Sequence, residues 1–192
     1  MNATATPSRA FLFARHGATD WNRDGRIQGR TDNPINDEGI AQAFAIARRL
    51  RRFQIDQIVT SPLVRAVKTA EIIAAPSATP VTVDKDLIAF DYGNLEGQVI
   101  TDTMRTHGLK SVQDFVSILP DSESWTSAAD RVLGCVCRWV AAGAQGTVLF
   151  VSHDLMMQAL STKLCGRWFT NRYGTPYRFA PTEAGWVVDE IY

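Results

Sequence analysis

The chain has 192 residues, a length that suits one domain with a sizeable hydrophobic core. It is 45% hydrophobic and 21% charged, which is typical of a water-soluble globular protein. Its 20 basic and 20 acidic residues give a formal net charge of zero, which argues against nucleic acid or a membrane surface as a partner. No apolar run approaches the roughly 20 residues of a membrane span.

Residues 1–9 lack the apolar core of a signal peptide, and we expect a flexible tail there, followed by a single domain over residues 10–192. No repeat, low-complexity tract or linker divides that domain. The three cysteines, Cys135, Cys137 and Cys165, match no metal-binding spacing. We therefore expect free thiols in a reducing compartment and a cytoplasmic protein.

The first predicted strand, residues 11–14, consists of four apolar residues and ends at Arg15, His16 and Gly17. A polar, glycine-rich stretch over residues 17–39 follows the strand. Loops of this length in compact domains are usually functional or disordered, and the apolar residues within this stretch favour an ordered loop.

A helix is predicted over residues 38–53, with Asn36 or Asp37 as its cap. The apolar residues recur at helical spacing, and the stripe expected to be buried consists of Ile40, Phe44, Ala47 and Leu50. Four arginines near the C-terminal end suit the helix macrodipole. A nucleic-acid patch is a second interpretation of these arginines, and no other basic cluster supports it.

The next predicted strand covers residues 56–60 and ends at Ser61, which is expected to cap a helix over residues 62–75. Arg65 falls in the first turn of this helix, beside backbone amides that attract anions. A second basic residue therefore follows the end of a second strand.

The middle of the chain alternates between irregular and helical segments. The predicted elements are a strand over residues 81–84, short helices over 99–107 and 111–118, and a long helix over 123–142. Ser122 or Asp121 is expected to cap the long helix.

A nearly continuous apolar run over residues 147–152 predicts a central strand that is covered on both faces. It ends at His153 and Asp154, before a helix predicted over residues 155–164. The last predicted elements are two strands of an antiparallel edge, over residues 177–179 and 186–191.

These alternating elements predict an α/β fold: a single three-layer domain with a mainly parallel central sheet and helices on both faces. Ligands bind such sheets at the carboxyl ends of the strands, where this chain places Arg15, His16, Arg65 and His153. Arginine matches phosphate oxygens bidentately, and histidine can act as a nucleophile. No cluster of acidic residues indicates a magnesium site, so no metal is expected.

Three ordered blocks of residues resemble the histidine phosphatase superfamily, often described as phosphoglycerate mutase-like. The shorter blocks are Ser61-Pro62-Leu63 with Arg65, Ala66, Thr69 and Ala70, and Val151-Ser152-His153. The strongest block is Phe13-Ala14-Arg15-His16-Gly17, followed at the family spacing by Thr19, Trp21, Asn22, Gly25, Arg26, Gln28, Gly29, Asp32, Pro34 and Gly39.

The resemblance implies a phosphoglycerate mutase-like fold, no cofactor, and a role for each matching residue. His16 would be the nucleophile that becomes phosphohistidine, and Arg15 and Arg65 would hold the phosphoryl oxygens. His153 would complete the phosphate pocket, and Asn22 matches a position that contacts the phosphoryl group in relatives. Further phosphate contacts are expected from Gln28 and Gly29.

Two positions depart from the family pattern. Relatives usually carry a glutamate, the proton donor to the leaving group, where this chain has Ala89. General acid catalysis is typically worth about 10²–10⁴-fold, so Asp91 or, more weakly, Asp20 is a candidate substitute acid. Asp154 stands where glycine usually follows the histidine, and its carboxylate would either repel phosphate or orient His153 and raise its pKa.

The leading prediction is a metal-independent phosphatase that hydrolyses a small phosphorylated metabolite through a phosphohistidine on His16. Ala89 leaves open a catalytically impaired or dead relative that binds a phosphorylated ligand or a partner. A phosphoglycerate mutase is less favoured, because mutases carry a basic insertion in the region of residues 98–124, which here contains only Arg105, His107 and Lys110. The protein is expected to be a monomer or a homodimer.

Overall fold

A computed structural model describes residues 6–111, 114–115, 123–142 and 146–192. Its strands are β1 (Phe11–Arg15), β2 (Ile55–Thr60), β3 (Val81–Val83), β4 (Thr147–Ser152), β5 (Pro176–Thr182) and β6 (Gly185–Glu190). They form one sheet in the order β3-β2-β4-β1-β5-β6. The first four strands in this order run parallel, and β5 and β6 add an antiparallel hairpin. The predicted parallel sheet with an antiparallel edge is confirmed.

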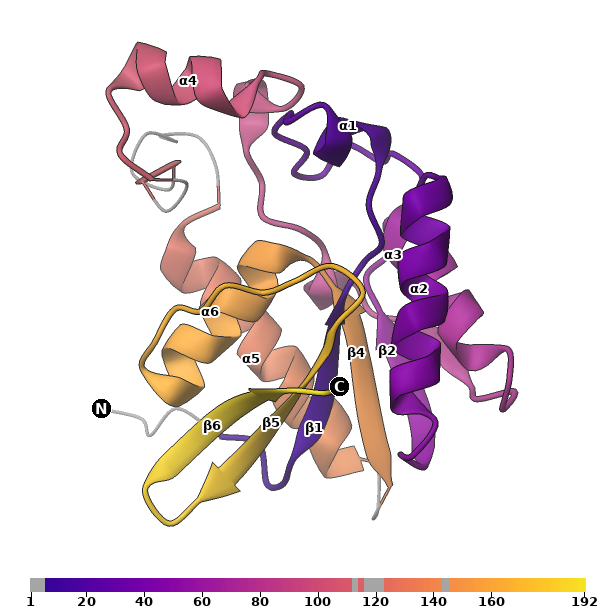
Figure 1. Cartoon of the computed structure of the whole chain (residues 1–192). Helices are drawn as coiled ribbons and strands as arrows, with labels where there is room; N and C mark the ends of the chain where they lie inside the picture. Colours follow the sequence, from indigo (N-terminus) through magenta and orange to yellow (C-terminus); the bar gives the residue numbers. More distant parts are fainter. Residues whose placement is uncertain (1–5, 112–113, 116–122, 143–145) are drawn as a thin grey trace.

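Helices cover both faces of this sheet (Figure 1). One face carries α2 (Asp37–Leu50) and α3 (Val64–Ala74), and the other carries α5 (Trp125–Ala142) and α6 (Asp154–Cys165). Beyond the carboxyl ends of the parallel strands lie α1 (Asp20–Arg23) and α4 (Ile100–His107). Two short 3₁₀ turns, η1 (Lys85–Leu87) and η2 (Gly93–Leu95), connect β3 to α4. The three-layer α/β arrangement is therefore confirmed.

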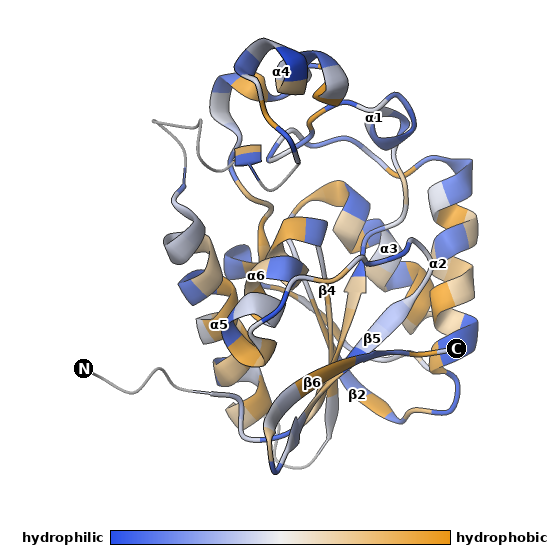
Figure 2. Cartoon of the chain, turned by 60° about the vertical axis from the view of Figure 1, so that its left-hand side comes forward, coloured by the Kyte–Doolittle hydropathy of each residue, from blue (hydrophilic) through white to orange (hydrophobic). Residues whose placement is uncertain are grey.

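The side chains of β1 alternate between two hydrophobic cores, because successive residues of a strand point to opposite faces. Phe11 and Phe13 join the core formed with α5 and α6, whereas Leu12 and Ala14 join the core formed with α2 and α3. The central strand β4 is almost wholly apolar, as Figure 2 shows, and every residue after Thr147 is buried. Its apolar residues on both faces require the helical layer on each side.

The buried face of α2 differs from the predicted stripe, which is wrong at Phe44. This side chain is 52% exposed, and the buried residues are Gly39, Ala43, Ile46 and Leu50. The reason is a close backbone contact: a Cβ atom at Gly17 would overlap with the carbonyl of Gly39, and a Cβ atom at Gly39 would overlap with the backbone of Ala18. This approach turns the Gly39 side of the helix toward β1.

The loop predicted over residues 17–39 contains the four-residue helix α1, which sequence periodicity misses because it is so short. A capping box holds this helix: Thr19 and Asn22 each accept a hydrogen bond from the other's backbone N–H. The predicted cap of α2 at Asn36 is confirmed, since its side chain accepts from the backbone N–H of Gly39 at 2.9 Å.

The long helix α5 begins two residues later than predicted. Ser124 Oγ accepts from the backbone N–H of Ser127 at 3.1 Å and so caps the helix. The predicted caps, Asp121 and Ser122, lie outside the described residues, as do residues 1–5 of the expected tail and most of the helix predicted over 111–118.

The three cysteines are free, which confirms the prediction that they form no disulfide. Among the described residues, no helix combines the length and the apolar character that crossing a bilayer requires.

Replacing Phe150 with alanine should lower the free energy of unfolding by about 3–5 kcal/mol, because the ring is fully buried between β1 and the α5–α6 layer. Phe44→Ala is the matched control and should change stability by less than about 0.5 kcal/mol, since that ring is largely exposed. Urea denaturation of both variants measures the difference. Similar losses in both would contradict this assignment of the core.

Candidate active site

The carboxyl ends of three parallel strands meet at one point of the sheet. Arg15 at the end of β1 pairs with Ser152 at the end of β4, and Thr60 at the end of β2 pairs with Val151. The residues that follow the β1 and β4 ends are therefore neighbours: the ring centroids of His16 and His153 lie 5.1 Å apart. The strand-end convergence predicted from the sequence is confirmed for these two histidines.

His16 is held in one tautomer by its own loop. Its Nδ1 lies 2.7 Å from the carbonyl oxygen of Gly17, and a carbonyl only accepts, so Nδ1 carries the proton. Burial lowers the pKa of His16 well below its usual value, and the positive charges of Arg65 and Arg15 lower it further. The ring is consequently neutral, with its lone pair on Nε2, the opposite edge.

His153 is held by Ser61, which the sequence analysis assigned as a helix cap. His153 Nε2 lies 2.8 Å from Ser61 Oγ, and this oxygen also accepts from the backbone N–H of Leu63 at 3.4 Å. Where Ser61 donates its hydroxyl hydrogen to Nε2, the ring proton of His153 lies on Nδ1. Burial, followed by the charges of Arg65 and His16, lowers the pKa of His153 well below its usual value.

The prediction that Ser61 caps the next helix is therefore wrong. This helix, α3, begins at Val64, two residues later than expected. Its first amide is bound by Asp32, whose Oδ1 accepts from the backbone N–H of Val64 at 2.7 Å. The loop before α2 caps α3, and the hydroxyl of Ser61 turns instead to His153.

Arg65 is almost completely buried, with 1% of its surface exposed. It donates from Nη1 to the carbonyl of Thr31 at 2.8 Å and from Nη2 to the carbonyl of Gly29 at 2.6 Å. Burial lowers the pKa of Arg65 to about 10, with Asp32 and Glu96 opposing that effect, so the guanidinium stays charged at neutral pH. The backbone of Gly29, predicted to bind phosphate, contacts Arg65 through its carbonyl.

Glu96 shapes the turn that holds Arg65, and the sequence analysis missed it. Its Oε1 accepts from the backbone N–H of Arg30 at 2.7 Å, and its Oε2 accepts from the backbone N–H of Thr31 at 2.8 Å. Gly29 has a φ of +54°, and a Cβ atom there would overlap with this carboxylate. The signal that could have drawn attention to Glu96 is its place between two glycines, Gly93 and Gly97, in a segment typical of turns.

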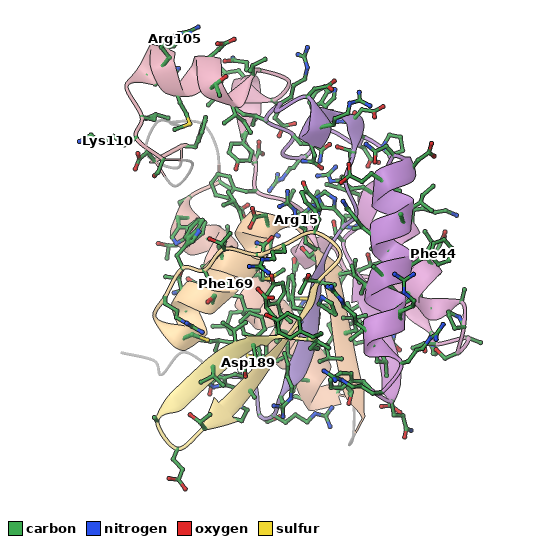
Figure 3. All side chains as sticks on the ribbon, in the orientation of Figure 1. Arg15, Phe44, Arg105, Lys110, Phe169 and Asp189 are labelled. Carbon is green, nitrogen blue, oxygen red and sulfur yellow. The ribbon has the colours of Figure 1, made fainter. Side chains whose placement is uncertain are left out.

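Arg15 is positioned by the first residue of α6 and by the loop that follows this helix. Its Nη2 donates to the hydroxyl of Tyr173, its guanidinium carbon lies 3.9 Å from the centre of that ring, and its Nη1 lies 3.5 Å from Asp154. Figure 3 shows Arg15 at the upper end of the sheet, whereas Phe44 projects from the outer face of α2. Tyr173 lies in a long loop without periodicity, and no signal in the sequence pointed to it.

One pocket with a volume of about 140 Å³ is lined by Arg15, His16, Arg65, His153 and Asp154, and the predicted Asn22, Gln28 and Gly29 also contribute to it. Asn22 caps α1, and Gln28 accepts from the hydroxyl of Thr19 at 2.6 Å. Within the part of the chain that the structure describes, three buried nitrogens have no hydrogen-bond partner: Arg15 Nε, Arg65 Nε and His153 Nδ1. The two arginine nitrogens are donors, and His153 Nδ1 is a third when Ser61 donates to Nε2, so this pocket suits an anion with several acceptor oxygens.

Comparison with known proteins identifies the family. The sequence model of the histidine phosphatase superfamily (branch 1) matches residues 11–186. The chain belongs to this superfamily.

Relatives of this superfamily member include an uncharacterized phosphatase, PhoE, from Bacillus subtilis, with 37% identity over 82% of this chain and 78% of the relative. A probable phosphoglycerate mutase, GpmB, from Citrobacter koseri is 34% identical over 80% of this chain and 74% of the relative. The fold is similar to that of a mycobacterial glucosyl-3-phosphoglycerate phosphatase solved with VO₃, with a TM-score of 0.83, 24% identity, and coverage of 95% and 98% of the two chains.

Asp154, which departs from the family pattern, acts on Arg15 and not on His153. Its carboxylate accepts from Arg15 at 3.5 Å, from Gln158 Nε2 at 3.2 Å and from Asn171 Nδ2. The expectation that it orients His153 and raises the pKa of that ring is wrong, because burial lowers the pKa and Ser61 holds the ring.

The predicted substitute acids do not line the pocket, although Ala89 does. Asp91 forms an ion pair with Arg30 at 3.0 Å, and Asp20 forms one with Arg23 at 2.8 Å on the exposed side of α1. Asp154 is the one carboxylate among the described residues that line the pocket. In the described part of the chain, no three His, Cys, Asp or Glu side chains could together hold a metal ion.

Because the pKa values of His16 and His153 are lowered, both rings should stay neutral as the pH falls through about 6.5 and should protonate only at lower pH. NMR titration of the ring protons between pH 8 and pH 5 measures this directly. The exposed His107 is the only other histidine and serves as the comparison ring. Protonation of His16 at or above pH 6.5 would contradict the neutral site.

Proposed function

We propose that the protein is a phosphatase that hydrolyses a small phosphomonoester through a phosphohistidine on His16, without a metal ion. The observation that supports this most directly is that His16 is neutral and has its lone pair on Nε2, on the edge of the ring away from Gly17. A neutral imidazole lone pair is the form of histidine that attacks phosphorus. We further propose that the enzyme works in the cytoplasm on a phosphorylated metabolite, as a monomer or a homodimer.

The reaction would have two steps. Nε2 of His16 bonds to phosphorus while the ester P–O bond breaks, and the oxygen of the leaving group takes the electron pair. Water then attacks the phosphohistidine, the P–N bond breaks, and phosphate and neutral His16 are regenerated. Charge on the transferred group is stabilised by fixed donors, for which Arg15, Arg65 and His153 are the candidates.

Arg65 suits this role because its geometry is set before any ligand arrives. Two of its five N–H groups are already bound to the carbonyls of Gly29 and Thr31, so the directions of the other three are fixed as well. Preorganised donors stabilise a transition state without reorganising during the reaction.

A mutase activity is less well supported by the region that precedes α5. Arg105 is paired with Asp102 at 2.8 Å, and Figure 3 shows Arg105 and Lys110 on the outer side of this region, away from Arg15. The relatives include both a named phosphatase and a named probable mutase. The outward position of Arg105 and Lys110 supports the phosphatase interpretation.

Replacing His16 with alanine should lower kcat/KM for p-nitrophenyl phosphate by at least about 10³-fold, or about 4 kcal/mol of transition-state stabilisation, because no covalent intermediate can form. Rapid quenching of the wild type with a ³²P-labelled substrate should trap label on His16. His107→Ala, on exposed α4, is the matched control and should keep full activity. A wild type without turnover that still binds phosphate would favour the binding protein instead.

Ala89→Glu should raise turnover of alkyl phosphomonoesters by about 10²–10⁴-fold and that of p-nitrophenyl phosphate only slightly. Ala89 lines the pocket, so a carboxylic acid there can protonate a basic alkoxide as it leaves, whereas nitrophenolate needs no proton. Ala89→Gln, which has the same size and no acidic proton, is the control. Equal gains on both esters, or gains in the glutamine variant, would rule out acid catalysis from this position.

A further inference from the structure

One side of the pocket is apolar, and its residues have no part in holding phosphate. This apolar wall consists of Ile27, Phe90, Tyr92, Ile100, Phe115 and Leu155. The rings of Phe90 and Tyr92 pack edge-to-face with centroids 5.4 Å apart, and those of Tyr92 and Phe115 do so at 6.3 Å. Such geometry is the one that aromatic side chains prefer, and an aromatic ligand ring can extend the same packing.

The wall is fixed by an ion-pair network behind it. Arg131 donates from Nη1 to the carbonyls of Asp86, at 2.6 Å, and Ile88, at 2.9 Å, and it pairs with Glu123 at 2.6 Å. Arg30 Nε donates to the carbonyl of Ala89 at 3.4 Å. The backbone that leads into Phe90 is thus held, so this part of the wall is formed before a ligand binds.

Among the described residues that line the same pocket, none is suited to protonate a leaving oxygen. Its one carboxylate among the described residues, Asp154, is surrounded by the donors of Arg15, Gln158 and Asn171 and accepts from all three. Both histidines are neutral, because burial lowers the pKa of each ring. Burial also raises the pKa of the Tyr92 hydroxyl, which makes that group a weaker acid than a free phenol.

We propose that the substrate is an aryl phosphate, with its aromatic ring on the apolar wall and its phosphoryl group between Arg15, Arg65 and the two histidines. This inference rests on the proposed function. A phenol has a pKa of about 10, whereas an aliphatic alcohol is a far weaker acid, so a phenolate leaves far more readily without a proton donor. The lack of a proton donor among the described pocket residues and the aromatic wall therefore favour the same class of substrate, a phosphate ester of a phenol.

The first step balances without an acid. Nε2 of His16 forms the P–N bond, the aryl P–O bond breaks, and the phenolate leaves with the electron pair. The phenolate takes its proton from bulk water after release. A water molecule then hydrolyses the phosphohistidine as in the proposed function.

The wild-type enzyme tests this with three esters: 2-naphthyl phosphate, 2-phenylethyl phosphate and acetyl phosphate. The first two carry an aromatic ring, but only the naphthyl ester has a phenolic leaving group, and acetyl phosphate has a good leaving group without a ring. We expect kcat/KM for the naphthyl ester to exceed that for the phenylethyl ester by at least about 10²-fold. We expect KM for the naphthyl ester to be about tenfold below that for acetyl phosphate.

Substitutions in the wall separate ring binding from chemistry. Ile100→Ser, at a partly exposed position at the start of α4, should lower the ratio of kcat/KM for naphthyl phosphate to that for acetyl phosphate by about tenfold. Phe115→Ser should do the same, and it is the second variant because its buried ring also affects folding. Phe44→Ser, on the outer face of α2 (Figure 3), should leave the ratio unchanged.

The failures of the two proposals are distinguishable. Hydrolysis of all three esters with equal efficiency, or an unchanged ratio in both wall variants, would overturn the aryl substrate and leave the phosphohistidine mechanism standing. No hydrolysis of any ester, acetyl phosphate included, would overturn both. Loss of phenylethyl phosphate hydrolysis in Tyr92→Phe would show that Tyr92 donates a proton and would also overturn the inference.

Discussion

The site depends on a positive charge that is buried among neutral acceptors. Arg65 forms its hydrogen bonds with the carbonyls of Gly29 and Thr31, and no carboxylate in the described part of the chain forms an ion pair with it. Glu96 holds the turn that supplies those carbonyls, and Asp32 caps the helix that carries Arg65. The carboxylates thus fix the guanidinium in place without neutralising it by contact. A buried, uncompensated charge is costly, and a doubly charged ligand would relieve that cost.

Together with burial, this charge also favours the neutral form of the two histidines. Burial lowers their pKa values, and Arg65 is the largest electrostatic contribution to that lowering in both. Neutral rings can have distinct roles, because the partner of one nitrogen fixes the tautomer: Gly17 binds Nδ1 of His16, and Ser61 binds Nε2 of His153. His16 therefore offers a lone pair at Nε2, and His153 offers a donor at Nδ1 when Ser61 donates to its other nitrogen.

The sequence predicted the parts of the structure that depend on local pattern. The apolar runs that end at Arg15 and His153 indicated parallel strands, and the geometry of parallel strands brought their ends together. The contacts of Ser61 and Tyr173 could not be predicted, because they join segments far apart in the chain. The prediction of the buried face of α2 was wrong for a related reason. Two stripes of residues fit helical spacing equally well, and the contact between Gly17 and Gly39 determines which one is buried.

That contact between Gly17 and Gly39 makes the site sensitive to residues that meet no ligand. The amide of Gly17 donates to Thr69 on α3, and its carbonyl accepts from Nδ1 of His16, so one residue joins two helices to this ring. A methyl group at Gly39 would press on the backbone of Ala18 and push the loop that carries this carbonyl. In a survey of random variants, substitutions at Gly39 would therefore be grouped with those at His16, and the positions that tolerate no change would extend from the pocket onto the first turn of α2.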